Sequence, residues 1–84
     1  MPEISRFYGI IIKMYFFDSE HNQPHIRAIY NKEVAIINIQ TLKVIEGRIP
    51  KRALKLVNEW ISIHENEIKN IWHTQQFKKI EPLK

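Results

Sequence analysis

The sequence contains no cysteine, and only two of its 84 residues are glycine. The absence of cysteine excludes disulfide bonds, zinc–thiolate sites and thiol nucleophiles, and it fits a reducing compartment. With so few glycines, the chain has no glycine-rich loop of the kind that cradles phosphates. It also lacks a Ser/His/Asp arrangement and a pair of neighbouring carboxylates. These absences leave the histidines and the basic residues as the candidates for chemistry.

Long apolar runs are missing as well. No stretch approaches the roughly 20 residues that a membrane-spanning helix needs. The first residues, Met1–Arg6, do not follow the charged-then-apolar order of a secretion signal. We therefore expect a cytoplasmic protein without a membrane partner.

What the chain does have is a moderate positive charge and enough apolar residues for one small core. Thirteen Lys/Arg against nine Asp/Glu give a formal net charge of +4. Such a surplus favours nucleic acid or an acidic protein as partner. A chain of this length forms one domain, 1–84, with a small and marginally stable core, so a partner or a second copy would add stability.

The pattern of apolar residues predicts an α+β fold. We expect an antiparallel three- to four-stranded β-meander in residues 1–47, then a C-terminal helical hairpin or bent helix in residues 50–77 and an irregular tail in 78–84. Short polar connections, including a tight turn at Asn31-Lys32, favour the meander. The expected strands are Ile4–Phe17 as a central strand with Gly9 as a bulge or close backbone approach, His25–Tyr30, Glu33–Ile39 and Leu42–Glu46.

The helical part begins at Pro50, which suits the first turn of a helix. Apolar residues then recur with a period of 3.6, from Leu54 through Trp60 to Trp72. The pattern is long for one helix, and the residues at 63–66 favour caps, so we predict a bend or break there. His64 lies on the apolar stripe and is expected to be a core histidine or a cap rather than a catalytic group.

Three residues form a first candidate site. His25 and Arg27 share one face of the predicted strand, and His21 lies in the loop just before it. Histidine exchanges protons near neutral pH, and a neighbouring arginine stabilises negative charge. This set could cleave RNA through its own 2′-hydroxyl. The alternative is that these histidines cap the loop, form hydrogen bonds in it or merely face water. Two histidines and Asp18 are too few ligands for a closed zinc site, so we predict neither metal nor cofactor.

A second candidate site is the basic start of the predicted helix. Arg48, Lys51, Arg52 and Lys55 cluster around the first helical turn. Cations at this end oppose the helix dipole, at a cost of about 0.3–1 kcal/mol each. Their position makes sense if an anion such as a phosphate backbone docks there. The alternative is a set of solvated cations without function. Tyr8 and the neighbouring aromatic residues are expected in the core or at an interface rather than in a base-stacking surface.

Several motifs together resemble a known family. They are Ile4-Ser5-Arg6-Phe7-Tyr8-Gly9-Ile10 with Met14-Tyr15, the loop His21…Pro24-His25-Ile26-Arg27, Gly47-Arg48-Ile49-Pro50-Lys51-Arg52-Ala53-Leu54, and Glu59-Trp60. The chain resembles the small prokaryotic domain-of-unknown-function family 4160 over nearly its whole length. The resemblance implies a toxin of a type II toxin–antitoxin pair, beside a second small protein. The family pattern often reads His-x-Pro-Pro-His-Phe-His, whereas this chain has Gln23 and Arg27 at two of those positions.

Two hypotheses follow. In the first, the protein is a toxin that acts on RNA: His21 and His25 exchange protons, and Arg27, Arg48, Lys51 and Arg52 hold phosphates. In the second, it is a non-enzymatic interaction module. The predicted helix covers one face of the sheet, so the face with His25, Arg27 and Ile29 needs a cover. A homodimer partner or a cognate small antitoxin-like protein would supply it.

Overall fold

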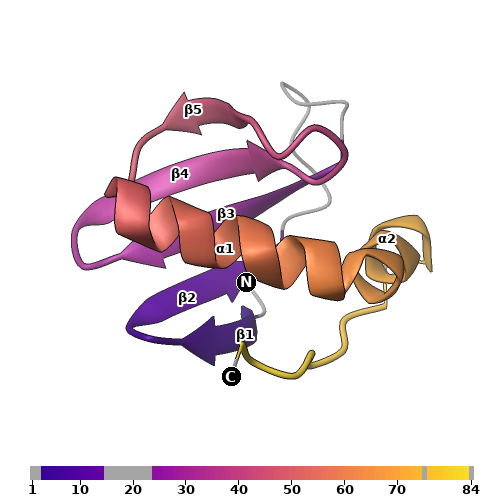
Figure 1. Cartoon of the computed structure of the whole chain (residues 1–84). Helices are drawn as coiled ribbons and strands as arrows, with labels where there is room; N and C mark the ends of the chain where they lie inside the picture. The colour runs from indigo at the N-terminus through magenta and orange to yellow at the C-terminus, as the bar shows by residue number, and fades with distance from the viewer. Residues whose placement is uncertain (1–2, 15–23, 75, 84) are drawn as a thin grey trace.

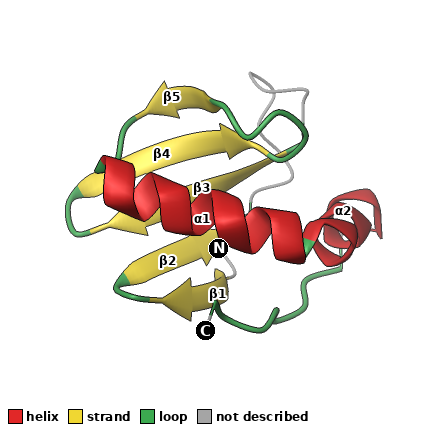
Figure 2. Ribbon diagram, in the orientation of Figure 1, coloured by secondary structure: helices red, strands yellow, loops and turns green. Residues whose placement is uncertain are grey.

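A computed structural model describes residues 3–14, 24–74 and 76–83 of the chain. Figures 1 and 2 show an antiparallel sheet with two helices after it, an α+β arrangement. The strands lie side by side in chain order, β1-β2-β3-β4-β5. Their bounds are Glu3–Phe7 for β1, Ile10–Lys13 for β2, His25–Tyr30 for β3, Glu33–Asn38 for β4 and Val44–Gly47 for β5; the helices are α1, Lys51–Ile63, and α2, Glu65–Thr74. None of the described helices is long and apolar enough to cross a membrane.

The meander is confirmed, but the number of strands is five rather than three to four. The prediction of one central strand over Ile4–Phe17 is wrong, because a two-residue turn at Tyr8-Gly9 divides it and Phe7 pairs with Ile10. Both turn residues have positive φ, 49° and 78°, as in the hairpin turn that matches the twist of its strands. β1 is consequently an edge strand, and Gly9 is a turn residue rather than a bulge. The stretch from Tyr15 to Phe17 lies outside the described residues.

The last strand begins later than predicted. Leu42 has a φ of 63°, which lies outside the extended range of a non-glycine strand residue, so the expected strand Leu42–Glu46 starts only at Val44. The Asn38 side chain stabilises the preceding turn: its Oδ1 accepts the backbone N–H groups of Gln40 (2.7 Å) and Thr41 (3.0 Å). This Asx-type bonding ends β4 one residue before the predicted end.

Helix α1 crosses one face of the sheet (Figure 1), and its Trp60 is completely buried. The helix ends where a break was predicted, at His64, whose backbone N–H donates to the carbonyl of Trp60. The His64 ring lies beside the Trp60 ring, with centroids 5.6 Å apart, and 3.1 Å from the Glu67 carboxylate. His64 is thus the residue at which the helical segment bends. The core beneath α1 combines alternate strand residues with one stripe of the helices: Ile10, Ile12, Ile26, Ala28, Ala35, Ile37, Ala53, Val57, Ile61 and Ile68.

The C-terminal segment after α2 is irregular, as predicted, yet it packs along the outer edge of β1. Ile80 is buried, and its N–H donates to the carbonyl of Ile4 (2.7 Å). Lys79 lies 3.4 Å from the carboxylate of Glu3. The guanidinium of Arg6 also donates to this carboxylate and lowers the pKa of Glu3 below its usual 4.5, with the charges of Arg6 and Lys79 adding to the effect. One edge of the sheet is thereby covered by the chain itself.

The two glycines give a matched test of this fold. Both have positive φ, but a Cβ at Gly47 would overlap the carbonyl oxygen of Val34, whereas one at Gly9 would meet Tyr30 at an ordinary 3.6 Å. We expect Gly9→Ala to lower the free energy of unfolding by about 1 kcal/mol, the left-handed backbone penalty alone. Gly47→Ala should cost about 3 kcal/mol, because backbone must also move. Urea unfolding measures both; equal losses would contradict the β4–β5 geometry.

Candidate functional site

The histidine loop is only partly within the described residues. His21 lies outside them. His25 begins β3, is 1% exposed and packs its ring edge-to-face against Trp72 of α2, with centroids 5.2 Å apart. Arg27, two residues along the same strand, is half-buried and pairs across the sheet with Ile36. The His25 ring is therefore a packing element between the sheet and α2, and it is not presented at the surface.

The basic residues at the start of α1 are arranged differently. Arg48, Lys51, Arg52 and Lys55 are all exposed, and the Arg48 side chain, 88% exposed, lies 3.6 Å from the Glu33 carboxylate. The first turn of α1 contains no acidic residue and its N-cap has no side-chain hydrogen bond. The first N–H that bonds within the helix is that of Leu54, to the carbonyl of Pro50. The N–H groups of the preceding helical residues add positive potential to that of the four cations.

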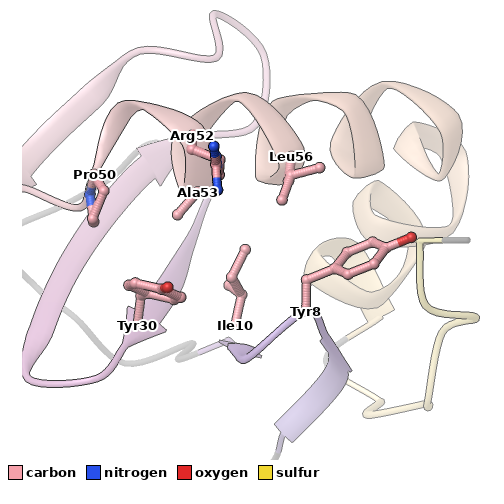
Figure 3. A pocket seen from close by; sticks show the side chains of 7 residues that line it. All are labelled: Tyr8, Ile10, Tyr30, Pro50, Arg52, Ala53 and Leu56. Carbon is pink, nitrogen blue, oxygen red and sulfur yellow. The ribbon is translucent and has the colours of Figure 1, made fainter.

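Beside this helix start the surface is hollowed into a cavity of about 550 Å³, here called the entrance pocket (Figure 3). The first two turns of α1 form one side of this pocket. The β1–β2 turn and the last residue of β3 form the other. In Figure 3, Arg52 lies above the opening, with Tyr30 and Ile10 below it and Tyr8 at one side. The lining residues are Tyr8, Ile10, Tyr30, Pro50, Arg52, Ala53 and Leu56.

Tyr8 occupies an unusual backbone position at the rim of the entrance pocket. Its φ of 49° is left-handed, a conformation that bulky side chains rarely adopt, and its side chain is 59% exposed. The same chain places an asparagine, the favoured residue, at the left-handed position of the β3–β4 turn, Asn31 with φ 55°. Phe7 packs against the Tyr8 ring edge-to-face at 6.4 Å. A tyrosine is therefore held in a strained, exposed position where the local conformation favours asparagine.

The pocket combines three kinds of surface. Ile10 and Ala53 are buried and give an apolar floor, the two phenol rings give flat walls, and the Arg52 guanidinium gives a positive charge at the mouth. Such a site suits a flat aromatic group that carries a negative charge beside it. Within the described residues, no group of three or more His, Asp or Glu side chains could hold a metal ion.

The cations of this site were predicted from the sequence, whereas its two tyrosines were not. Tyr8 was expected in the core or at an interface because it stands inside an apolar run, and Tyr30 was treated only as part of a strand face. The one local signal was Tyr8-Gly9: a glycine after an aromatic residue, inside an otherwise continuous β pattern, marks a hairpin turn that exposes the aromatic ring.

Fold and site together define a small α+β domain with a positively charged pocket at its helix start. Comparison with protein families gives a match to the domain of unknown function DUF4160 over residues 9–73. The chain belongs to this family. Comparisons with curated proteins and with solved structures gave no match.

Replacing Tyr8 by asparagine tests the strain at the rim. We expect Tyr8→Asn to raise the free energy of unfolding by about 1 kcal/mol, because asparagine adopts the left-handed conformation more readily. Tyr8→Phe, which keeps a bulky ring at the same φ, is the control and should change stability little. Thermal or urea unfolding of the wild type and the two variants measures this free energy. A loss of stability in Tyr8→Asn would show that the contacts of the tyrosine ring stabilise the fold by more than its left-handed backbone conformation costs.

Proposed function

We propose that the protein binds single-stranded RNA, with a base in the entrance pocket and the flanking phosphates along the start of α1. The observation that carries this proposal is the arrangement of Tyr8, Tyr30 and Arg52 around one pocket, among three further exposed cations. Proteins that bind single strands without strong sequence preference combine aromatic rings, on which bases stack, with a positively charged track for the backbone.

The tyrosine rings account for the base. Stacking of a base on an aromatic side chain is worth about 1–3 kcal/mol and tolerates any base, because every base has a flat face. A pocket of about 550 Å³ is large enough for one nucleobase with its ribose, and its apolar floor excludes water from the stacked face. The exposed Tyr8 ring can rotate over an inserted base, while Tyr30 is fixed at the end of β3.

The cations account for the phosphates. Arg52 lies at the mouth of the pocket, and Lys51, Lys55 and Arg48 are exposed around the same helix start. A phosphate placed here meets both the side-chain charges and the positive end of the helix dipole. The cost of placing cations at this end of the helix is then offset in the complex, which explains why the first turn contains no acidic residue.

The proposal is binding and does not include cleavage. None of the residues that line the pocket is a histidine or a carboxylate, and His25 is buried against Trp72. A pair of groups that exchange protons with a bound ribose is therefore not part of the described pocket. The roles of His21, His25 and Arg27 in catalysis, and the toxin activity that the resemblance implies, stay predictions.

The binding test uses a 12-nucleotide single-stranded RNA with a 3′ fluorescent label, followed by fluorescence anisotropy. We expect Arg52→Gln and Tyr8→Asn each to raise the Kd about tenfold, since each removes one charge-assisted or stacking contact. For Arg52→Gln the slope of log K against log salt should also become shallower by about 0.7, the value for one lost phosphate contact on a single strand.

Lys69→Gln is the matched control. It removes the same charge, but from α2, where Lys69 pairs with Glu65 at 2.7 Å and is not one of the residues that line the entrance pocket. Its Kd should change less than twofold. Equal weakening by Lys69→Gln and Arg52→Gln would show that net charge alone attracts the RNA, and undiminished binding by Tyr8→Asn would remove the stacking role.

A further inference from the structure

The two edge strands of the sheet, β1 and β5, differ in what lies beside them. The outer edge of β1 is covered by the C-terminal segment, with the Ile80 N–H bonded to the Ile4 carbonyl. The outer edge of β5 has no strand beside it in the described part of the chain (Figure 1). All four residues of β5 are exposed, among them Val44 at 37% and Ile45 at 38%. A sheet edge with exposed apolar side chains and no described strand beside it is a surface on which another strand can pair.

The order of side chains along this edge is complementary to itself. Residues 43–46 read Lys-Val-Ile-Glu. If a second copy lies antiparallel beside it, with the twofold axis between residues 44 and 45, Lys43 faces Glu46 of the other copy and Val44 faces Ile45, and the same pairs recur on the other side of the axis. Opposite charges placed directly across two strands stabilise the pairing, and the exposed apolar side chains of Val44 and Ile45 add contact beside the axis.

A bulge in β5 makes this register possible. When the twofold axis is perpendicular to the sheet, two side chains that face each other across it must project from the same face of the sheet. In a regular strand, however, residues three apart, such as Lys43 and Glu46, project from opposite faces. Val44 pairs with Ile37 and Glu46 with Ile36, so the ladder shifts at Ile45 and puts Val44 and Glu46 on opposite sides. Lys43, which precedes Val44, therefore falls on the same side as Glu46. The bulge brings both charged residues to one face, as the symmetric pairing requires of Lys43 and Glu46; Val44 and Ile45 lie beside the axis, at the bulge itself.

We propose that β5 pairs with β5 of a second copy and joins two sheets into one continuous sheet across a twofold axis. The interface is short, so the dimer is weak and forms at about 10⁻⁵–10⁻³ M. Because the axis is perpendicular to the sheet, both α1 helices lie on the same face of the joined sheet. The dimer thus carries both entrance pockets on one side, although the pairing does not depend on what the pockets bind.

Charge reversal tests the register. The dimer contains two symmetry-related pairs of residues 43 and 46. Lys43→Glu turns both pairs into glutamate facing glutamate, and Glu46→Lys turns both into lysine facing lysine. Each single change should raise the dimer Kd on the order of tenfold, from the loss of two exposed ion pairs and their replacement by repulsion. Lys32→Glu, in the β3–β4 turn, carries the same change in net charge as Lys43→Glu and should leave the dimer Kd unchanged. Sedimentation equilibrium over 10 μM to 1 mM measures the Kd.

A mixture of the two charge-reversed variants gives the sharpest test of the β5–β5 pairing. A Lys43→Glu chain and a Glu46→Lys chain should form a heterodimer with each other at least as tight as the wild-type dimer, since every facing pair is again of opposite charge. The double variant should likewise recover the wild-type Kd. A wild-type chain that stays monomeric at 1 mM would overturn the proposal. So would a dimer indifferent to both single changes, or one that the mixture fails to restore. Circular dichroism of each variant confirms that the monomer is folded.

Discussion

The complete burial of Trp60 is the interaction on which the rest of the structure depends. Its ring packs against Phe7 of β1 at 5.6 Å and against His64 at the helix break, and its Nε1–H donates to the carbonyl of Glu81 (2.9 Å). One side chain thus joins the first strand, the bend between the helices and the C-terminal segment. Because this large buried ring contacts β1, the helix break and the C-terminal segment together, it determines the position of α1 over the sheet.

The entrance pocket is a consequence of that position. With α1 held at Trp60, its first two turns project over the end of the sheet, and small Ala53 leaves room that Tyr8 and Tyr30 border without filling. Gly47, with its positive φ, ends β5, and α1 begins after the N-cap Pro50, so that Arg52 in the first helical turn lies at the pocket. The strain at Tyr8 and the uncapped, basic first turn both cost stability locally. Both occur at the same pocket, which is where a binding function would offset them.

The sequence predicted the elements whose signals are local. The helix break near His64, the strand His25–Tyr30 and the turn at Asn31 all carry their cause within a few residues. It did not predict the hairpin at Tyr8, because a tyrosine at a left-handed position contradicts turn preferences, nor the packing of Ile80 on β1, because that contact joins residues far apart in the chain. The basic residues of the candidate site could be predicted because they follow one another closely in the sequence. That Tyr8 and Tyr30 line the same pocket could not be predicted, because it depends on how the strands and α1 pack.

The proposed function requires that the entrance pocket bind a single-stranded polyanion with stacked bases. The most direct measurement is a titration of the ¹⁵N-labelled protein with an unlabelled oligouridine, followed by amide chemical shifts. Saturable shifts are predicted at Tyr8–Ile10, at Tyr30 and at residues 51–56, with α2 unchanged. Shifts that map instead to the sheet face of Arg27, or no saturable shifts at all, would contradict the claim.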